Sequence, residues 1–384
     1  MLNVCSSYFF YIMNGKSVIT DIKQLTPEWL TNIFKKKGYL SNGKVTKIIK
    51  KNSLETFISN WHFLELNFSN NAQTETISSE IAVKTPKPND IAKLLGKHEV
   101  KFYNIVAETI NEMPIPTCYD ATFSEETGRS HIILDYFSKT HIALMDAPLP
   151  PLKRYCERAI DCLAELHALW WDHQKLQELS KHSFVFDLHK ENSFNEKKIL
   201  SWFKKENRSL KRLIRFLGDR MSNKRKELFD ALFSLYPQLA FERIKKKNIT
   251  LIHADANFWN FFYPKDIENE KNKAKLFDWD VWAIGVGGQD LSHMIGYFWY
   301  PERRHLMEKD LIKRYHNDLL KLGVKSYSWD ECWYDYKLSA LLILYRVAWF
   351  WSLMPHLGLW WSGLERSILT VEDLNCIELL ESKL

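Results

Sequence analysis

The sequence lacks several features that mark particular classes of protein. No apolar run reaches the roughly 18 residues that a membrane-spanning helix needs. The chain has 6 cysteines, but no two of them form the C-x-x-C pair of a zinc or redox site. It contains no G-x-x-x-x-G-K-S/T sequence, which argues against a P-loop nucleotide-binding protein. These absences favour a globular protein of the cytosol, where scattered thiols stay reduced.

Apolar and charged residues are present in ordinary proportions. Of the 384 residues, 46% are hydrophobic and 26% are charged, which suits two domains or lobes with a sizeable core. The first residues, MLNVCSSYFFYIM, have no positively charged start and no clear cleavage site. We expect a strand or a tail there rather than a signal peptide.

The net charge of +6 is concentrated in one segment. Residues 196–227 contain 12 Lys or Arg and 4 Asp or Glu, so the rest of the chain carries a small negative charge. The apolar residues of this segment recur at helical spacing, which predicts an amphipathic helix with a solvated basic face. Such a face is also able to bind nucleic acid or an anionic membrane, so nucleic-acid binding stays open as an alternative function.

The two ends of the chain differ in their hydrophobic patterns. Between residues 45 and 85, short runs rich in apolar and β-branched residues predict strands, and 130–137 predicts another. A helix is expected over residues 90–112. From residue 138 onward the patterns are mostly helical. We therefore predict an α+β fold with a small β-rich N-terminal lobe (1–137) and a mostly helical C-terminal lobe (138–384).

The exception in the helical part is the segment 248–282, which contains the runs TLIHADANFWNFF and AKLFDWDVW. Asp255 and Asn260 follow the first short strand, and Asp278 follows the second. A β-hairpin would bring Asp278 beside Asn260. A carboxylate and an amide oxygen are hard ligands suited to Mg²⁺ in a phosphate site. Asp255 would remain to accept a proton from a hydroxyl group, which completes the parts that phosphoryl transfer needs.

The order H-x-D-x-x-x-x-N, then D-W-D, then Asp290-Leu291 resembles the aminoglycoside phosphotransferase/choline kinase-like family. It is especially similar to the bacterial small-molecule kinases and ecdysteroid-kinase-like relatives within that family. The resemblance spans about residues 45–350. It implies a bilobal fold like that of protein kinases, with ATP and Mg²⁺ as cofactors. It also implies Asp255 as the catalytic residue and Asn260 and Asp278 as metal ligands.

The resemblance extends to residues that would bind the nucleotide. The family needs a strand lysine paired with a helix glutamate, and Lys84 in SEIAVKTP and Glu99 in GKHEVKFYNIV match that order. The strand HIILDYF resembles the hinge that meets the adenine, so Asp135 and Phe137 are expected at the nucleotide.

Two departures from the family pattern stand out. Its loop usually reads H-G-D, whereas this chain has Ala254, which is costly if the residue needs a positive φ. The expected nucleotide-covering loop, residues 50–61, contains no glycine. Ser53 and Thr56 are candidate phosphate contacts in its place. His253 is expected to hold the loop by hydrogen bonds, and Asp290 either ties the loop down or caps a helix.

The sequence thus predicts a cytoplasmic, ATP-dependent kinase of a small-molecule hydroxyl group. The alternatives are a catalytically silent kinase-like binding protein and a nucleic-acid binder that uses residues 196–227. Residues 291–384 contain 7 of the 15 tryptophans and a nearly balanced charge, which disfavours a polycationic aminoglycoside. Aromatic walls suit a flat apolar alcohol or, through cation–π contact, an amine.

Overall fold

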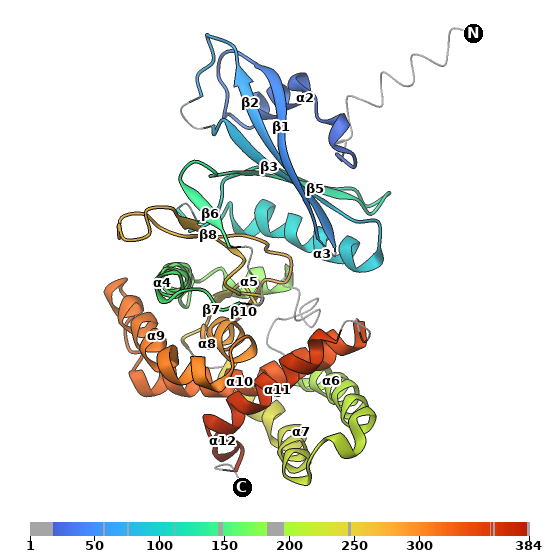
Figure 1. The fold of residues 1–384 in the computed structure, drawn as a ribbon, viewed down its shortest axis with the longest axis vertical. Helices are drawn as coiled ribbons and strands as arrows, with labels where there is room; N and C mark the ends of the chain where they lie inside the picture. The colour runs from blue at the N-terminus through green and yellow to red at the C-terminus, as the bar shows by residue number, and fades with distance from the viewer. Residues whose placement is uncertain are drawn as a thin grey trace, which may run out of the picture. The chain divides into compact units, whose positions relative to one another are not determined.

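The protein forms two compact units (Figure 1). The structure is a computed structural model that describes residues 18–56, 58–74, 77–110, 112–144, 149–182, 196–244, 247–353, 355 and 358–381. The first unit comprises Met1–Asn111 and Ile115–Ile142, and the second comprises Glu112–Pro114 and Ala143–Leu384. The strand or tail expected at the N-terminus lies outside the described residues.

The first unit is built on an antiparallel sheet of five strands in the order β1-β2-β3-β5-β4. The strands are β1 (Val45–Glu55), β2 (Ser59–Phe68), β3 (Glu80–Pro86), β4 (Cys118–Phe123) and β5 (Ser130–Asp135). Strand β3 is buried along its whole length, because β2 pairs with it on one side and β5 on the other. Any polar side chain on β3 therefore lies inside the unit and needs a partner.

Helices complete the first unit. They are η1 (Ile22–Gln24), α2 (Pro27–Lys36), α3 (Asp90–Lys101) and the π-helical turn η2 (Phe102–Val106). The hydroxyl of Thr26 caps α2 by accepting a hydrogen bond from Trp29 N at 3.1 Å. The helix expected over 90–112 is shorter, since the α-helix ends at Lys101 and a π turn follows. The helix does not extend to residue 112, because Glu112 has a left-handed φ of +67° and Pro114 restricts Met113.

The second unit is mainly helical. Its helices are α4 (Lys153–Trp170), α5 (Leu176–Leu179), η3 (Ser180–His182), α6 (Glu196–Leu217), η5 (Gly218–Arg220), α7 (Asn223–Ile244), α8 (Gly288–Ser292), the π-helical turn η6 (His293–Tyr297), α9 (Pro301–Lys321), α10 (Trp329–Leu353), α11 (Leu359–Asp373) and α12 (Ile377–Glu381). Its short strands are β7 (Thr250–Ile252), β8 (Phe261–Pro264), β9 (Lys275–Leu276) and β10 (Ala283–Gly285). Strand β6 (His141–Ala143) spans the boundary between the units along the chain.

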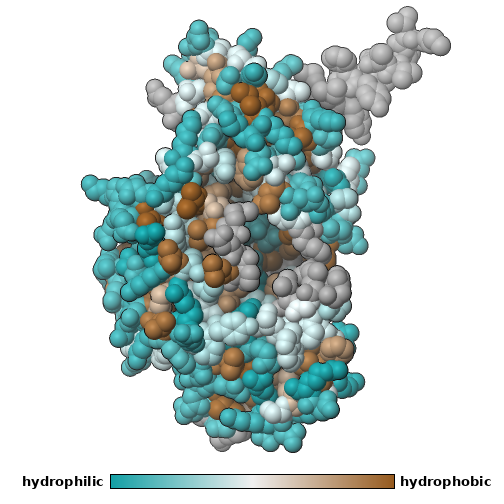
Figure 2. Space-filling view, viewed as in Figure 1, coloured by the Kyte–Doolittle hydropathy of each residue, from teal (hydrophilic) through white to brown (hydrophobic). Residues whose placement is uncertain are grey.

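Helix α6 has the two faces that the sequence predicts for the basic segment. Leu210, Leu213 and Leu217 are buried in a core shared with α7, α10 and α11. Lys204 and Arg208 are exposed, and the surface around α6 and α7 is mainly hydrophilic in the view of Figure 2. The apolar stripe thus accounts for the position of the helix, and the basic side chains face solvent.

Close backbone contact fixes α8 against α10. A Cβ atom added at Gly288 would lie 2.7 Å from the backbone oxygen of Asp335 on α10. Only glycine fits there without a backbone shift, so the start of α8 is set by direct contact between the two main chains. This matters because α8 carries Asp290.

The predicted α+β fold class is confirmed, with an antiparallel sheet in the N-terminal unit and helices in the C-terminal one. The assignment of residues 1–137 to nucleotide binding and 138–384 to catalysis stays a prediction. No helix within the described residues is long and apolar enough to cross a membrane.

Candidate active site

A loop leaves β7 at His253 and reaches Asn260, just before β8. The imidazole of His253 is fully buried, and its Nε2 hydrogen-bonds with Phe277 O at 2.9 Å. Its Nδ1 accepts a hydrogen bond from Asp255 N at 3.3 Å. Both ring nitrogens therefore bond to backbone groups. Through Phe277, the imidazole connects the loop to the residue that follows β9.

Asp290, in the first turn of α8, anchors the start of this loop. Its two carboxylate oxygens accept hydrogen bonds from His253 N and Ala254 N, each at 2.8 Å. His167 of α4 lies 3.2 Å from the same carboxylate through Nε2, and its Nδ1 is 2.8 Å from the hydroxyl of Tyr315 on α9. Burial alone would raise the pKa of Asp290, but the hydrogen bond with His167 and the loop donors lower it. Of the two roles expected for Asp290, the structure supports the anchoring of the loop.

Ala254 occupies the position where the family usually has glycine, and its φ is +62°. A left-handed conformation costs a residue with a Cβ atom roughly 1–2 kcal/mol. Both backbone polar groups of Ala254 are held: Asp290 accepts from its N–H, and Arg346 of α10 donates to its carbonyl oxygen. Such strain persists only where surrounding contacts fix the conformation.

One oxygen of the Asp255 carboxylate has two side-chain partners, a guanidinium and an imidazole. Its Oδ1 accepts from Arg346 and lies 3.1 Å from Nε2 of His293. The other oxygen, Oδ2, is 3.4 Å from the amide nitrogen of Asn260, a long hydrogen bond. Burial by itself would raise the pKa of Asp255, but Arg346 and His293 lower it to about 2. Asp255 is therefore a carboxylate at neutral pH, with Oδ2 the less occupied oxygen.

The sequence does not indicate Arg346 and His293 as partners of Asp255. Arg346 is 91 residues from Asp255 along the chain, so no local spacing links the two. One signal was present, because Arg346 is the only Asp, Glu, Lys or Arg between Leu338 and Leu364. An isolated charge in an apolar helix needs a buried partner.

Asn260 and Asp278 are brought to neighbouring positions by the hairpin of β8 and β9. Phe277 N donates to Asn260 O at 3.0 Å, which places Asp278 one residue beyond that pair. The amide nitrogen of Asn260 is turned toward Asp255 O, at 3.1 Å. No donor among the described residues contacts the side-chain oxygen of Asn260, so this oxygen is available to a ligand.

These two residues fit a magnesium ion held jointly with phosphate. Among the described residues, no group of three His, Cys, Asp or Glu is arranged to hold a metal. Mg²⁺ is commonly bound by one or two protein oxygens, with phosphate oxygens and waters completing its shell. The donor set is consistent with that type of site, and the role of both residues stays a prediction.

In the first unit, Lys84 and Glu99 form an ion pair between β3 and α3. Lys84 Nζ lies 2.6 Å from the Glu99 carboxylate, and the two side chains are 3% and 0% exposed. The ammonium group is also 5.3 Å from the ring centroid of Trp61 on β2. The structure thus brings together the lysine and the glutamate that the sequence pairs, and their role toward a nucleotide stays a prediction.

The remaining candidate nucleotide contacts lie on the same sheet unit. Asp135 ends β5, and its backbone N–H donates to Thr117 O at 2.9 Å. The ring of Phe137, two residues later, is 5.2 Å from that of His141. Ser53 lies near the end of β1, on its exposed part. These positions neither support nor contradict contact with a nucleotide.

Thr56 has a local structural task in the turn between β1 and β2. Its hydroxyl lies 2.9 Å from the hydroxyl of Ser59 and 3.0 Å from Ser59 O. It also accepts a hydrogen bond from Ser59 N at 3.0 Å. Phosphate binding through the Thr56 hydroxyl would therefore compete with the contacts that close this turn.

Aromatic side chains surround the Asp255 loop. The ring of Trp259 is 5.0 Å from that of Phe298, and His293 stacks on Tyr297 at 5.4 Å. Tyr297 in turn stacks on Phe350 at 6.1 Å. Asp255 and its partners thus lie beside a continuous set of rings contributed by the loop, η6 and α10.

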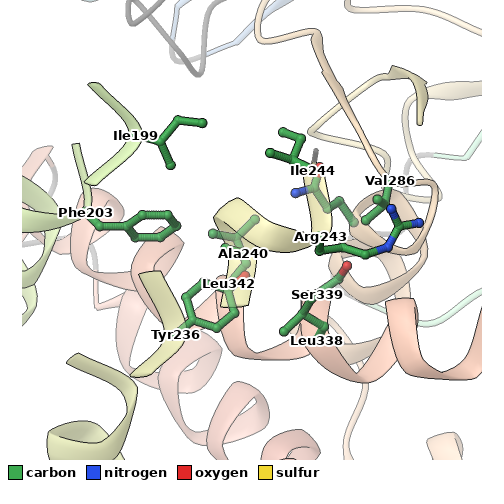
Figure 3. A pocket seen from close by; sticks show the side chains of 11 residues that line it. Ile199, Phe203, Tyr236, Ala240, Arg243, Ile244, Val286, Leu338, Ser339 and Leu342 are labelled. Carbon is green, nitrogen blue, oxygen red and sulfur yellow. The ribbon is translucent and has the colours of Figure 1, made fainter. Parts of the chain in front are cut away.

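A separate small cavity lies among α6, α7 and α10 (Figure 3). Its lining is mostly apolar, and the guanidinium of Arg243 at its edge is already paired with Asp335 at 2.5 and 2.6 Å. The volume of about 40 Å³ has room for a few waters. In this conformation the cavity does not accommodate a larger molecule.

Solved structures with a similar fold are small-molecule phosphotransferases. Aminoglycoside 2'-phosphotransferase-IIIa in its GDP complex is 10% identical, with 91% of this chain and 99% of that chain covered and a TM-score of 0.51. The GDP and kanamycin complex of APH(2")-IIia is 13% identical over 91% and 99% of the two chains, with a TM-score of 0.50. Choline kinase from Streptococcus pneumoniae is 12% identical over 90% and 98%, with a TM-score of 0.47. The first two structures, with TM-scores of 0.50 or more, show that the chain shares its fold with these phosphotransferases.

The family follows from the sequence match. The model of the ecdysteroid kinase-like family matches residues 53–325, which is well over half of the chain. The protein belongs to the ecdysteroid kinase-like family. A comparison with curated protein sequences finds no match. The chain is therefore related to small-molecule kinases, as the motif around Asp255 predicted.

Proposed function

We propose that the protein is an ATP-dependent phosphotransferase that phosphorylates a hydroxyl group of a small molecule with the help of Mg²⁺. The observation that carries this proposal is the loop that presents Asp255 beside Asn260, together with the hairpin contact between Asn260 and Phe277, the residue before Asp278. A carboxylate free to meet a hydroxyl, next to two oxygen ligands for a metal, suits phosphoryl transfer. Membership of a kinase-like family supports the same activity.

Separate groups are suited to the nucleotide phosphates and to their metal ion. Lys84, held by Glu99, is a charge suited to the phosphates, and Asn260 and Asp278 would hold Mg²⁺. When bound, the ion neutralises charge on the phosphate oxygens. The solved relatives with GDP support a nucleotide as the second substrate, and they make GTP a necessary comparison with ATP.

Asp255 would act chiefly by orienting the acceptor hydroxyl. Since Arg346 and His293 occupy Oδ1, the acceptor hydroxyl would donate its hydrogen bond to Oδ2. A carboxylate with a pKa of about 2 is a weak base, so the proton would leave the hydroxyl late in the transfer. Phosphoryl transfer tolerates this, because it relies on positioning more than on proton removal.

The surroundings of Asp255 favour a neutral acceptor with an apolar surface. The rings of Trp259, Phe298 and Phe350 can cover an apolar molecule, and the guanidinium of Arg346 places a positive charge at the catalytic carboxylate. This charge is paired with Asp255, so it does not by itself exclude an amine, which the tryptophan content had left open. The acceptor panel below distinguishes the two.

The test is formation of ADP by the purified full chain with Mg²⁺-ATP and a panel of alcohols that includes neutral, anionic and cationic members. We expect ADP formation above the background with at least one neutral alcohol, a phosphorylated product by mass spectrometry, and loss of both on chelation of Mg²⁺. Binding of Mg²⁺-ATP without turnover across the panel would favour a silent binding protein. Absence of both binding and turnover would contradict the proposal.

A further inference from the structure

Arg346 touches two consecutive residues of the Asp255 loop. One terminal nitrogen of its guanidinium donates to Ala254 O, and the other donates to Asp255 Oδ1. The side chain leaves α10 beside Phe350, whose ring centroid lies 5.8 Å from the guanidinium carbon. It is 22% exposed, so most of the group is removed from water. The planar fork of arginine fits this double contact in a way that the single ammonium of lysine does not.

The contact with Ala254 holds a conformation that alanine adopts reluctantly. The N–H of Ala254 is fixed by Asp290 and its carbonyl oxygen by Arg346, so the peptide units on both sides of its φ and ψ angles are held. Glycine would keep the φ of +62° without strain. Since the residue is alanine, the loop needs an external contact to stay in this conformation.

The contact with Asp255 sets the direction of the carboxylate. Arg346 and His293 both bind Oδ1, and His293 is itself fixed by stacking on Tyr297 at an interplanar angle of 18°. The rotation of the carboxylate is therefore defined, and Oδ2 points away from these two donors. A carboxylate free to rotate would spend part of its time in orientations that do not meet a hydroxyl.

We propose that Arg346 is a positioning residue that holds Ala254 in its left-handed conformation and turns Oδ2 of Asp255 toward the acceptor hydroxyl. This inference rests on the proposed function. Arg346 does not touch the reacting atoms and acts through the loop. Its effect should therefore fall on kcat, with little change in the binding of Mg²⁺-ATP.

The test compares Arg346→Met with Arg225→Met in the full chain. Arg225 is a matched control, since it is 21% exposed and forms a two-oxygen ion pair with Glu365 at 3.0 and 2.9 Å away from the loop. We expect Arg346→Met to lower kcat about tenfold or more, with KM for ATP and the thermal shift by Mg²⁺-ATP unchanged. Arg346→Lys should fall between Met and the wild type. A kcat within threefold of the wild type, or an equal loss in Arg225→Met, would overturn the proposal.

A second variant separates positioning from a general structural role. Ala254→Gly should recover a large part of the kcat lost in Arg346→Met, because glycine reaches the left-handed conformation without help. No recovery of kcat by glycine would overturn the proposal.

One measurement needs no turnover. It tests whether Arg346 holds Ala254 separately from whether the protein is a phosphotransferase. Ala254→Gly should raise the Tm of the wild type by about 2 °C or more, and should raise it less in Arg346→Met, where alanine is free to relax. Equal Tm gains in the wild type and in Arg346→Met would show that Arg346 does not hold Ala254, even if the enzyme is active. Unequal Tm gains in a protein without activity would support the contact between Arg346 and Ala254 and contradict the phosphotransferase function.

Discussion

Two ion pairs contain candidate site residues, one pair in each unit, and they differ in how far water reaches them. Lys84 and Glu99 are almost completely buried, with exposures of 3% and 0%. Arg346 and Asp255 retain 22% and 27%. Loss of one partner from a buried pair leaves an uncompensated charge in an apolar interior, whereas water can still reach the partly exposed pair. Removing Glu99 should therefore act strongly on stability, in addition to the proposed role of Lys84 toward the phosphates, whereas removing the charge of Asp255 should act mainly on turnover.

The largest expected effect is on the partly exposed pair. Asp255→Asn keeps the shape of the side chain and removes its charge, so ADP formation should fall roughly 10²- to 10⁴-fold. The fold and the thermal shift by Mg²⁺-ATP should persist. Asp266→Asn, in the exposed turn between β8 and β9, provides the control and should retain wild-type turnover. Activity within tenfold of the wild type would place Asp255 outside the chemistry.

The buried pair should show the opposite balance. Glu99→Gln leaves Lys84 charged inside the sheet unit, and the free energy of unfolding should fall by about 3–5 kcal/mol. Glu125→Gln is the comparison, because it breaks an ion pair with Lys97 of α3, the helix that also carries Glu99. Glu125 is 74% exposed, so its loss should lower the free energy of unfolding by less than about 1 kcal/mol. Chemical denaturation of the two variants measures the contrast. Similar losses would mean that burial does not distinguish these pairs.

A third comparison concerns Asp278, one of the two residues proposed to hold the metal. Mg²⁺-ATP at 100 times its dissociation constant should stabilise the wild type by about 2.7 kcal/mol. Asp278→Ala should abolish most of that gain without lowering the stability of the ligand-free protein to a similar degree. Thermal melts with ATP and with GTP, each with and without Mg²⁺, provide the measurement. An undiminished shift in Asp278→Ala would remove this residue from the metal site.

The most gradual expected effect is the pH response of His293, the buried partner of Asp255. Burial and the charge of Arg346 lower the pKa of His293 to about 4, compared with about 6.5 in the unfolded chain. The unfolded state therefore binds more protons between pH 4 and 6.5, and stability contributed by neutral His293 is lost as the pH falls through that range. We expect a loss of up to about 3 kcal/mol, spread over that whole range. His293→Gln, which cannot titrate, should show a flatter curve of unfolding free energy in the same range.

The first ion pair was predicted from the family resemblance, which calls for a strand lysine and a helix glutamate, and the search succeeded because both parts are local. Lys84 lies on a strand with a clear apolar pattern, and Glu99 follows 15 residues later on a helix with Asn89 as its cap. The hairpin that places Asp278 beside Asn260 was also predictable, since two short apolar runs flank a polar turn. The helix end at Lys101 was missed, because the same apolar pattern continues into the π turn.

The second ion pair depends on tertiary contacts that carry no spacing signal. Arg346 reaches Asp255 because α10 packs against the start of α8, where Gly288 admits the close backbone contact. From the sequence, Ala254 could only be said to be unfavourable if its φ were positive. The structure shows that its φ is positive and that hydrogen bonds with Asp290 and Arg346 hold it there. Such details follow from packing between distant segments, which a pattern along the chain does not record.

The π-helical turn η6 adds a consequence for insertions and deletions in related sequences. A π turn contains about one residue more than an α-helical turn, so the segment from His293 to Tyr297 has the length of an α-helix with one inserted residue. Deleting a residue there would rotate the following chain by about 100°. Phe298 would then leave the face that contacts Trp259, while Asp290, which precedes the turn, would keep its place. Length changes at this point would therefore alter the rings beside the loop and spare its anchor.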